Sequence, residues 1–391
     1  MRSAVIVDIV RTASGRGKPG GALSGVHPVR LLADTLQALV ERTGIDPAEI
    51  DDVIAGCVQQ VGEQTNNIAR SAVLAAGWPE SVPGTTVDRQ CGSSQQAAHF
   101  AAQGVMSGAY DIVVACGVES MSRLPMGTAS IGQDPIDPLA QRYPEGLINQ
   151  GVAAELIAGR WKLDRETLDA YAARSHQRAA AVAAAGGFAN EIVPITVGGQ
   201  VHDQDQTLRA NTTAEGLAGL KPSFVDDALS ARFPEIAWSI TPGNSSPLTD
   251  AASAVLIMSE ERAAKLGLRP RARFHEFAVA GDDPLIMLTG VIPATRKVLA
   301  RAGMSIDDIG AYEVNEAFAP VPLAWQHDLQ ADPEKLNPRG GAIALGHALG
   351  ASGVRLLATL VNHLEATGER FGLQTMCEGG GLANATIIER L

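Results

Sequence analysis

The chain has 391 residues, of which 46% are hydrophobic and 19% charged, so it is long enough for two or three domains around a large buried core. Its net charge of −12 argues against a general binder of nucleic acid or of anionic membranes. Its four cysteines, with no C-x-x-C pair, do not indicate a disulfide scaffold or a zinc module, and no metal site is expected. No apolar run reaches the length of a bilayer span and the first residues show no secretion leader, so a cytoplasmic protein with free thiols is predicted.

Strands and helices alternate in the first third of the chain, which is typical of layered α/β proteins. The apolar run 4–10 predicts a buried strand. Pro28 predicts the start of a helix whose apolar residues recur at helical spacing, and Gly44 is expected to cap its end. Two further strands and a helix between them are predicted at 53–55, 112–116 and 93–107.

The alternation breaks in the middle of the chain. Four prolines interrupt a stretch with little periodicity from Glu119 to Gly151, and residues 190–248 are again irregular. Loops of this length are uncommon unless they are functional. Between them, one helix is predicted from an Asp164 N-cap to Gly186. We interpret residues 119–249 as an insertion into the α/β frame.

The segments on either side of this insertion resemble each other. Gly44 and Gly303 follow matching helices, and Gly108 and Gly368 each precede a matching strand, roughly 260 residues apart in both cases. The predicted division is an N-terminal half (1–118 plus 250–268), a loop domain (119–249) and a C-terminal half (269–391). In this pairing Cys91 and His347 each precede the equivalent helix of their half, so we expect the two side chains to converge.

Cys91 is a candidate nucleophile because it directly precedes an apolar-periodic helix. A helix N-terminus favours thiolate over thiol, and cysteine is the strongest nucleophile among side chains near neutral pH. A lone cysteine is more often a small buried apolar residue. Cys57 and Cys116, which lie in apolar strands, are given that interpretation.

Three other segments carry polar groups in unusual settings. His347 lies between glycines that permit close backbone approach, and Cys377 is followed by Gly379-Gly380-Gly381, whose N–H groups could bind an oxyanion. Asn315-Glu316 follows an apolar strand, at the edge where α/β sites gather. Each has a simpler explanation on its own: a structural histidine, a loose turn or an Asx turn.

Taken together, these four motifs resemble those of thiolases in order and spacing. They are Cys91 in Arg-x-Cys-x-Ser, Asn315-Glu316-Ala317-Phe318, Gly346-His347 and Cys377-x-Gly-x-Gly, and the resemblance covers essentially the whole chain. It implies a thiolase-like α/β fold with two pseudo-symmetric halves in five layers (α-β-α-β-α) and an inserted loop domain.

The resemblance also implies roles for these residues. Cys91 would form an acyl-enzyme, and His347 would activate it. His347 and a water held by Asn315 would stabilise the enolate oxygen. Cys377 would be the second acid and base, and the backbone N–H groups of Cys91 and Gly379 would form the other oxyanion hole.

For coenzyme A the resemblance implies a co-substrate and no tightly bound cofactor. Arg209 would meet the nucleotide end, Ser246 the pantetheine, and apolar side chains would line the channel: Phe224, Met287 and Phe318. It further implies a homodimer or homotetramer, and fatty-acid oxidation enzymes as possible partners.

Three positions depart from the family pattern. Ala348 follows the histidine where proline is usual, and Gly216 replaces a serine near the nucleotide end. Asn149-Gln150 stands where acetoacetyl-CoA thiolases tend to have His-Met, which disfavours a short-chain substrate.

The predicted activity is thiolytic cleavage of a 3-ketoacyl-CoA to acetyl-CoA and a shortened acyl-CoA by a ping-pong path. Alternatives are condensation of two acetyl-CoA to acetoacetyl-CoA, a ketosynthase-like condensing enzyme and a non-catalytic subunit of an oxidation complex. The segment Gly15–Gly20 fits the G-x-G-x-x-G of dinucleotide-binding proteins. That fingerprint needs a helix starting inside it, whereas the next helix is predicted only at Pro28, so we disfavour this interpretation.

Overall fold

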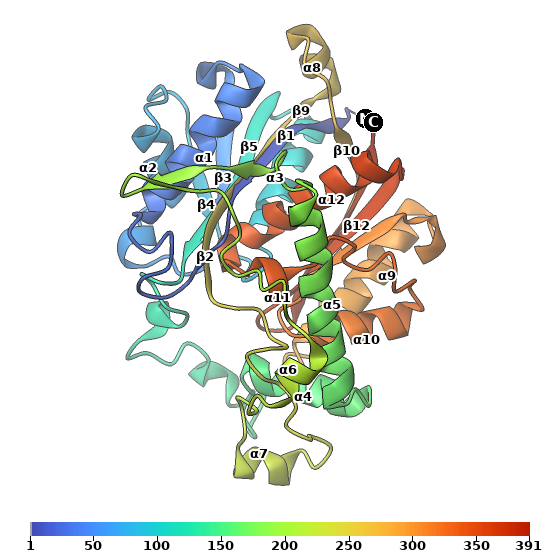
Figure 1. The fold of residues 1–391 in the computed structure, drawn as a ribbon. Helices are drawn as coiled ribbons and strands as arrows, with labels where there is room; N and C mark the ends of the chain where they lie inside the picture. Colours follow the sequence, from blue (N-terminus) through green and yellow to red (C-terminus); the bar gives the residue numbers. More distant parts are fainter. Residues whose placement is uncertain (1) are drawn as a thin grey trace.

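The computed structural model describes residues 2–391, and its two halves repeat one order of elements (Figure 1). The N-terminal half contains β1 (Ala4–Thr12), α1 (Pro28–Thr43), β3 (Asp52–Gly56), α3 (Ser93–Ser107), β5 (Ile112–Ser120) and β9 (Thr249–Ser259). The C-terminal half repeats this order with β10 (Ala272–Gly281), α9 (Val291–Ala302), β11 (Ala311–Val314), α12 (Ser352–Thr367), β12 (Phe371–Glu378) and β13 (Leu382–Arg390).

The sheet shows the same symmetry. Its strand order is β11-β12-β13-β10-β1-β9-β5-β3-β4, where β4 is Thr85–Val87, so equivalent strands lie at equal distances from the junction of β10 and β1. At that junction only Val5 pairs with Arg273 and Ile6 with Ala272, so this pairing is shorter than the strand pairings on either side of it. Within each half, parallel pairs lie on the outside and antiparallel pairs on the inside.

Three large apolar clusters define five layers. One cluster packs α1 and α2 (Ile68–Ala75) on the outer face of the N-terminal strands, and another packs α9 and α10 (Pro320–Leu329) on the outer face of the C-terminal strands. The third holds α3 and α12 between the strands of both halves, with Val105 and Leu357 among its members. The predicted layered α/β fold with two pseudo-symmetric halves is therefore confirmed.

The inner helices α3 and α12 cross at very short range. A Cβ atom on Gly353 would lie 2.1 Å from the backbone nitrogen of Gln95, so only glycine fits there. The Val354 N–H donates to Ser94 Oγ at 3.1 Å across the same contact. This crossing brings the N-terminal ends of both helices together. Cys91 lies two residues before α3, and His347 lies five residues before α12, ahead of the short turn Leu349–Ala351.

The matching glycines end matching helices. Gly44 after α1 has φ 67° and Gly303 after α9 has φ 65°, a left-handed conformation that glycine adopts without strain. The sequence repeat therefore reflects equivalent local structure in both halves.

The inserted segment contains more regular structure than its sequence predicts. Helix α5 (Arg165–Ala184) begins as predicted, with Asp164 accepting from the Thr167 N–H at 2.8 Å. Helix α4 (Gln150–Arg160) was not predicted, because residues 151–158 are buried on all sides and show no amphipathic period. Short elements complete the segment: β6 (Ile192–Val193), β7 (Ile195–Val197), β8 (Gln200–His202), α6 (Ala214–Ala218) and α7 (Asp227–Arg232).

Three further elements lie outside this pattern. Strand β2 (Gly15–Arg16) pairs with β9, and α8 (Glu260–Leu266) follows β9. Helix α11 (Ala342–Leu345) precedes His347. None of the helices within residues 2–391 combines the length and apolarity that a membrane crossing requires.

Candidate active site

Cys91 is presented by a tight turn at the N-terminus of α3. Gln90 has φ 48°, a left-handed conformation that costs a non-glycine residue energy. The turn is held by Ser93, whose Oγ accepts from the Arg89 N–H at 2.9 Å and donates to the Gln90 carbonyl at 2.6 Å. The Cys91 side chain is only 8% exposed.

The electrostatics of Cys91 differ from the sequence-based expectation. We expected the helix N-terminus to favour thiolate, but burial raises the pKa of Cys91 well above its ordinary value, and the nearby Cys377 and Glu378 raise it further. A backbone N–H bond opposes this shift without overcoming it. The buried sulfur is therefore a thiol that needs a base to become a nucleophile.

His347 is oriented as such a base. Its backbone N–H donates to Thr249 Oγ1 at 3.0 Å, and its Nδ1 lies 2.6 Å from Ser352 Oγ. Ser352 Oγ donates its own proton to the Ala348 carbonyl at 2.8 Å, so Nδ1 must carry the proton it shares with Ser352. Nε2 is then the free acceptor. Burial, and then the charge of Arg355, lower the pKa of His347 to about 3, which keeps the imidazole neutral.

Asn315 and Cys377 complete the group. Asn315 follows β11, and its Nδ2 lies 3.4 Å from His347 Nε2. Burial and then Glu378 raise the pKa of Cys377 to about 12, while a hydrogen bond from Asn315 lowers it. The Asn315 Oδ1 is buried and has no hydrogen-bond partner within residues 2–391, so the amide retains acceptor capacity toward a ligand.

The loop after β12 closes over the turn that carries Cys91. A Cβ atom on Gly379 would lie 3.2 Å from Gln90 Oε1, and one on Gly92 would lie 2.0 Å from Glu378 Oε1. Glycine at both positions therefore allows the two loops to touch. The structure brings together Cys91, His347, Asn315, Cys377 and Gly379, which come from four separate segments of the sequence.

A cavity of about 410 Å³ reaches this group at His347. His347 lines it, together with Met121 and Leu349, and these two side chains also pack against Cys91. The predicted residues Phe224, Ser246 and Phe318 line it as well, and the two phenyl rings meet edge to face at 6.1 Å. The Ser246 backbone N–H and Oγ both donate to the Ala317 carbonyl, at 3.0 and 3.1 Å.

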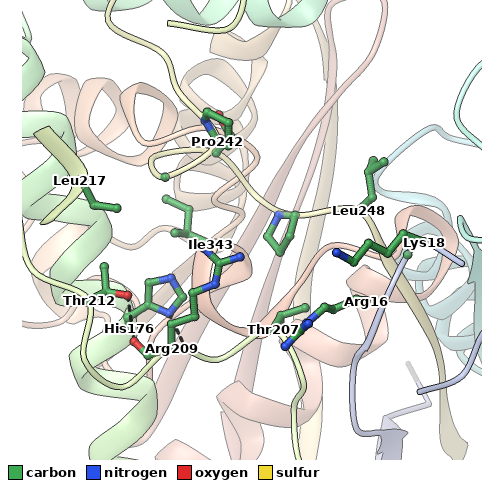
Figure 2. A pocket seen from close by; sticks show the side chains of 14 residues that line it. Arg16, Lys18, His176, Thr207, Arg209, Thr212, Leu217, Pro242, Leu248 and Ile343 are labelled. Atoms are coloured by element: carbon green, nitrogen blue, oxygen red, sulfur yellow. Dashed lines mark hydrogen bonds between the residues drawn. The ribbon is translucent and has the colours of Figure 1, made fainter. Parts of the chain in front are cut away.

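A second cavity of about 220 Å³ adjoins the first and shares part of its wall. The shared wall consists of Pro242, Ser245, Pro247 and Leu248. Figure 2 shows Arg16 and Lys18 on one side of this second cavity and Arg209 with His176 on the other. The two cavities therefore lie side by side, one with a basic mouth of Arg16, Lys18 and Arg209 and the other with the His347 imidazole in its wall.

The remaining predicted residues are placed as follows. Met287 is buried in the large C-terminal core cluster and lines neither cavity. Gly216 lies in the N-terminal turn of α6, and its N–H donates to Thr213 Oγ1 at 3.1 Å. Cys57 and Cys116 are buried in the outer apolar cluster of the N-terminal half, in agreement with their predicted structural role.

The departures from the family pattern have local explanations. Ala348 has φ −74°, the conformation that proline would impose, so the backbone after His347 keeps the shape expected with proline. Asn149 caps α4 by accepting from the Val152 N–H at 3.0 Å. Both Asn149 and Gln150 line the larger cavity.

Sequence reasoning missed several supporting residues. Ser352 and Thr249 fix the position of His347, and no periodic spacing signals this, because His347 lies before α12 and Thr249 lies on β9. Glu316 proves structural, because its carboxylate accepts from Tyr171, Ser175 and the Ile343 N–H. Arg16 and Lys18 were set aside with the G-x-G-x-x-G segment. No group of three or more metal-ligating side chains occurs in the part of the chain that the structure describes.

Comparisons with known proteins give a consistent result. The family description "Thiolase, N-terminal domain" matches residues 4–261, and "Thiolase, C-terminal domain" matches residues 268–390. The protein named steroid 3-ketoacyl-CoA thiolase FadA6 from Mycobacterium tuberculosis is 50% identical over 100% of this chain and 95% of its own length. A 3-ketoacyl-CoA thiolase of Escherichia coli is 45% identical over the full length of both chains. The crystal structure of the Bacillus anthracis acetyl-CoA acetyltransferase matches with a TM-score of 0.89 and 39% identity, over 100% of this chain and 99% of that one.

Proposed function

The chain belongs to the thiolase family, and on this basis we propose that it is a 3-ketoacyl-CoA thiolase, an acyltransferase that uses coenzyme A to release acetyl-CoA and a shortened acyl-CoA. Relatives named 3-ketoacyl-CoA thiolase, at 44% and 45% identity over their full length, support cleavage over the synthesis of acetoacetyl-CoA. The observation that carries the proposal is the meeting of a buried thiol, a neutral imidazole and a second thiol, with the imidazole in the wall of a cavity.

In the first half-reaction His347 Nε2 takes the proton of Cys91, and the sulfur attacks the 3-keto carbon of the substrate. The C2–C3 bond then breaks, and the electron pair moves onto the acetyl-CoA fragment as an enolate. Cys377 gives its proton to C2 of that enolate, so acetyl-CoA leaves and the acyl group remains on Cys91. The Asn315 amide lies beside His347, in a position to support stabilisation of the enolate oxygen.

In the second half-reaction the Cys377 thiolate takes the proton of free coenzyme A. The coenzyme A sulfur attacks the acyl carbonyl, with N–H groups of Cys91 and Gly379 as the proposed oxyanion donors. Collapse of the tetrahedral intermediate releases the acyl-CoA, and Cys91 regains its proton from His347. Protons and bonds balance over the two half-reactions, and ping-pong kinetics follow.

We propose that the acyl group is larger than that of acetoacetyl-CoA. The cavity beside His347 measures about 410 Å³ and is lined mainly by apolar side chains, including Met126 and Phe224. These side chains come from the inserted segment. One relative at 50% identity carries the name steroid 3-ketoacyl-CoA thiolase, which supports a bulky acyl group. A panel of acetoacetyl-CoA, straight-chain and ring-bearing 3-ketoacyl-CoA substrates tests this, with kcat/KM expected to rise with acyl size.

The catalytic assignment is tested by removing each sulfur in turn. Cys91→Ala is expected to abolish turnover, because the second thiol, Cys377, acts as acid and base in the proposed path and no other group there supplies the nucleophile. Cys377→Ala is expected to block carbon–carbon cleavage while still allowing slow acylation of Cys91, seen as a mass increase of the intact protein after incubation with an acyl-CoA. Cys116→Ala, on an apolar strand, serves as the control. A Cys91→Ala enzyme with near-native turnover contradicts the proposal.

Ligands, assembly, location and domain roles follow from the same family membership. We propose acyl-CoA and coenzyme A as the ligands, a homodimer or homotetramer as the assembly, and the cytoplasm as the location. We likewise propose that residues 119–249 act as a loop domain between halves 1–118 plus 250–268 and 269–391. The small cavity shared by loop-domain and N-terminal residues supports this division of roles.

A further inference from the structure

A buried carboxyl group lies between the two segments that carry the reactive sulfurs. Glu378 directly follows Cys377 at the end of β12 and is fully buried. Its Oε1 lies so close to Gly92, the residue after Cys91, that a Cβ atom on Gly92 would be 2.0 Å away. The carboxyl group is therefore next to one sulfur-bearing residue along the chain and faces the segment of the other across the fold. The proposed reaction gives it no role.

This carboxyl group has no hydrogen bond that would stabilise a negative charge. Neither Glu378 oxygen has a hydrogen-bond partner within residues 2–391. It therefore does not cap α3, although the N–H groups at a helix start readily bind a carboxylate. Glu119 shows the contrast, because its buried carboxyl group accepts from the N–H groups of Val58, Gln59 and Gly350. An ionised carboxyl group buried without such bonds is much less stable than the neutral acid, so the geometry favours a protonated Glu378.

The groups that face Glu378 leave it in this neutral form. Burial raises the pKa of Glu378 to about 9, the charge of Arg89 opposes this shift, and Asp88 adds to it. Arg89 lies on the turn that leads into α3, and its buried Nε has no hydrogen-bond partner in the described part of the chain. From β13, Asn384 presents an uncharged amide, whose Nδ2 donates to the Gly92 carbonyl at 3.1 Å. Arg89 thus weakens the effect of burial without cancelling it.

A negative charge on Glu378 would act on both sulfurs. Burial and then a charged Glu378 raise the pKa of Cys377 to about 12, and burial, Cys377 and then Glu378 raise the pKa of Cys91. In the proposed reaction Cys91 must lose its proton before it attacks, and Cys377 is a thiolate between the two half-reactions. Two negative charges close together in a buried site repel each other strongly. The neutral acid is therefore the form of Glu378 that both sulfurs need.

We propose that Glu378 is a positioning residue that must keep its proton for Cys91 and Cys377 to ionise, so that loss of this proton sets the alkaline limit of turnover. The inference rests on the proposed function, because it uses the roles given there to the two sulfurs. Glu378 passes no proton to the substrate in this scheme. It holds a carboxyl group against both catalytic loops without adding a charge to them. Turnover is expected to fall as the pH rises through about 9, as the acid ionises.

The first test is the pH dependence of kcat in a variant that cannot ionise. For Glu378→Gln, with each enzyme normalised to its own rate at pH 7, kcat at a pH of about 9.5 is expected to be about fivefold higher than for the unmodified enzyme. Ionisation of the coenzyme A thiol affects both enzymes equally, so the difference reports on residue 378. Glu378→Met, an uncharged side chain of similar volume, is a second variant with the same expected shift.

Glu313→Gln is the matched control. Glu313 is the other buried carboxyl group whose two oxygens both have no hydrogen-bond partner within the described residues. Its charged neighbours are Arg355 and Glu316, and it is not among the groups that shift either sulfur. The control variant is expected to keep the alkaline fall of the unmodified enzyme. It therefore separates a local effect on the sulfurs from a change in stability at high pH, which circular dichroism at each pH also monitors.

Alkylation of Cys91 tests the same inference without turnover. Iodoacetamide is uncharged and reacts with the thiolate, and the mass of the Cys91 peptide reports the rate. At a pH of about 9.5 the rate is expected to be about fivefold higher in Glu378→Gln than in the unmodified enzyme, relative to the rates at pH 7.

Two results overturn the inference. One is an alkaline fall in kcat at the same pH in Glu378→Gln, Glu378→Met and the unmodified enzyme. The other is an alkylation rate of Cys91 that depends on pH in the same way in all three proteins. Failure of the proposed function is a different outcome: the unmodified enzyme cleaves no 3-ketoacyl-CoA at any pH, while the alkylation rates still report on Glu378.

Discussion

At the scale of single residues, the site depends on hydrogen bonds that fix which atom of each group is free to react. The His347 imidazole is neutral because it is buried, and Ser352 fixes its proton on Nδ1. Both sulfurs are thiols because burial raises their pKa values. The base and the acid of the proposed reaction are thus present in the protonation states that the first step needs.

Ser352→Ala tests the orientation of the imidazole. The change removes the acceptor of the Nδ1 proton, so the ring can rotate or adopt the other tautomer. We expect kcat to fall about tenfold or more, equivalent to at least about 1.4 kcal/mol of transition-state stabilisation, with little change in KM. Steady-state kinetics with a 3-ketoacyl-CoA measure this. Ser130→Ala, in the exposed part of the insertion, is the control, and an unchanged kcat for Ser352→Ala would rule out the orienting role.

At the scale of elements, the crossing of α3 and α12 decides whether the two halves can share one site. Each helix belongs to a different half, and a candidate catalytic residue lies within five residues of the start of each. The contact at Gly353 allows their backbones to approach closely enough for those residues to meet. The site is therefore a property of the pair of helices.

Gly353→Ala is expected to force the two helices apart, because the added Cβ would lie 2.1 Å from the Gln95 nitrogen. Overpacking of this kind costs about 1–3 kcal/mol of the free energy of unfolding. We also expect turnover to fall much more than stability, because Cys91 and His347 separate. Urea unfolding and kinetics measure the two effects. Gly25→Ala is the matched control, since its Cβ would meet only Val197 Cγ1 at 3.9 Å.

At the scale of the whole molecule, the halves meet through a polar interior as well as an apolar one. Glu313 and Glu378 are fully buried, and neither carboxyl group has a hydrogen-bond partner within the described chain. Burial raises the pKa of Glu313 to about 8 and that of Glu378 to about 9. Both groups therefore remain protonated in the folded protein at pH 7, whereas they ionise in the unfolded chain.

This difference in proton binding makes stability depend on pH. Above the unfolded pKa of about 4.5, the native state holds protons that the unfolded state has lost, so stability falls as the pH rises through the folded values. The buried histidines have the opposite effect on stability only at lower pH. Above pH 6.5 they are largely neutral in the unfolded chain as well as in the folded protein, so they no longer contribute. We expect the free energy of unfolding to be higher at pH 6.5 than at pH 8, by up to about 1.4 kcal/mol per pH unit for each carboxyl group.

Urea unfolding at pH 6.5, 7 and 8 measures this dependence. The Glu378→Gln variant keeps the shape of the neutral acid. Its free energy of unfolding is expected to depend less steeply on pH. Glu80→Gln, at an exposed position, is expected to keep the full slope of the unmodified protein. If the free energy of unfolding depends on pH with the same slope in Glu378→Gln and in the unmodified protein, the Glu378 carboxyl group does not hold its proton at neutral pH.

The sequence by itself determined the elements and the kind of chemistry. Apolar periodicity and capping residues are local properties, so they predicted β1, α1, α3, β5 and α5, and the paired glycines predicted the repeat. Four short motifs indicated the family, because the identity and order of their reactive residues can be read directly from the sequence. Helix α4 escaped prediction, since a helix buried on all sides has no polar face to mark its period.

The tertiary structure alone decided how these parts act together. It placed Cys91 and His347 together, in the segments that lead into two crossing helices, and burial there reversed the expected pKa shift of the Cys91 thiol. It also showed that the segment Gly15–Gly20, which fits a dinucleotide-binding motif in sequence, contributes Arg16, Gly17 and Lys18 to the lining of a cavity. Distances across the chain and the loss of solvent depend on how distant segments pack, and no local pattern of residues contains that information.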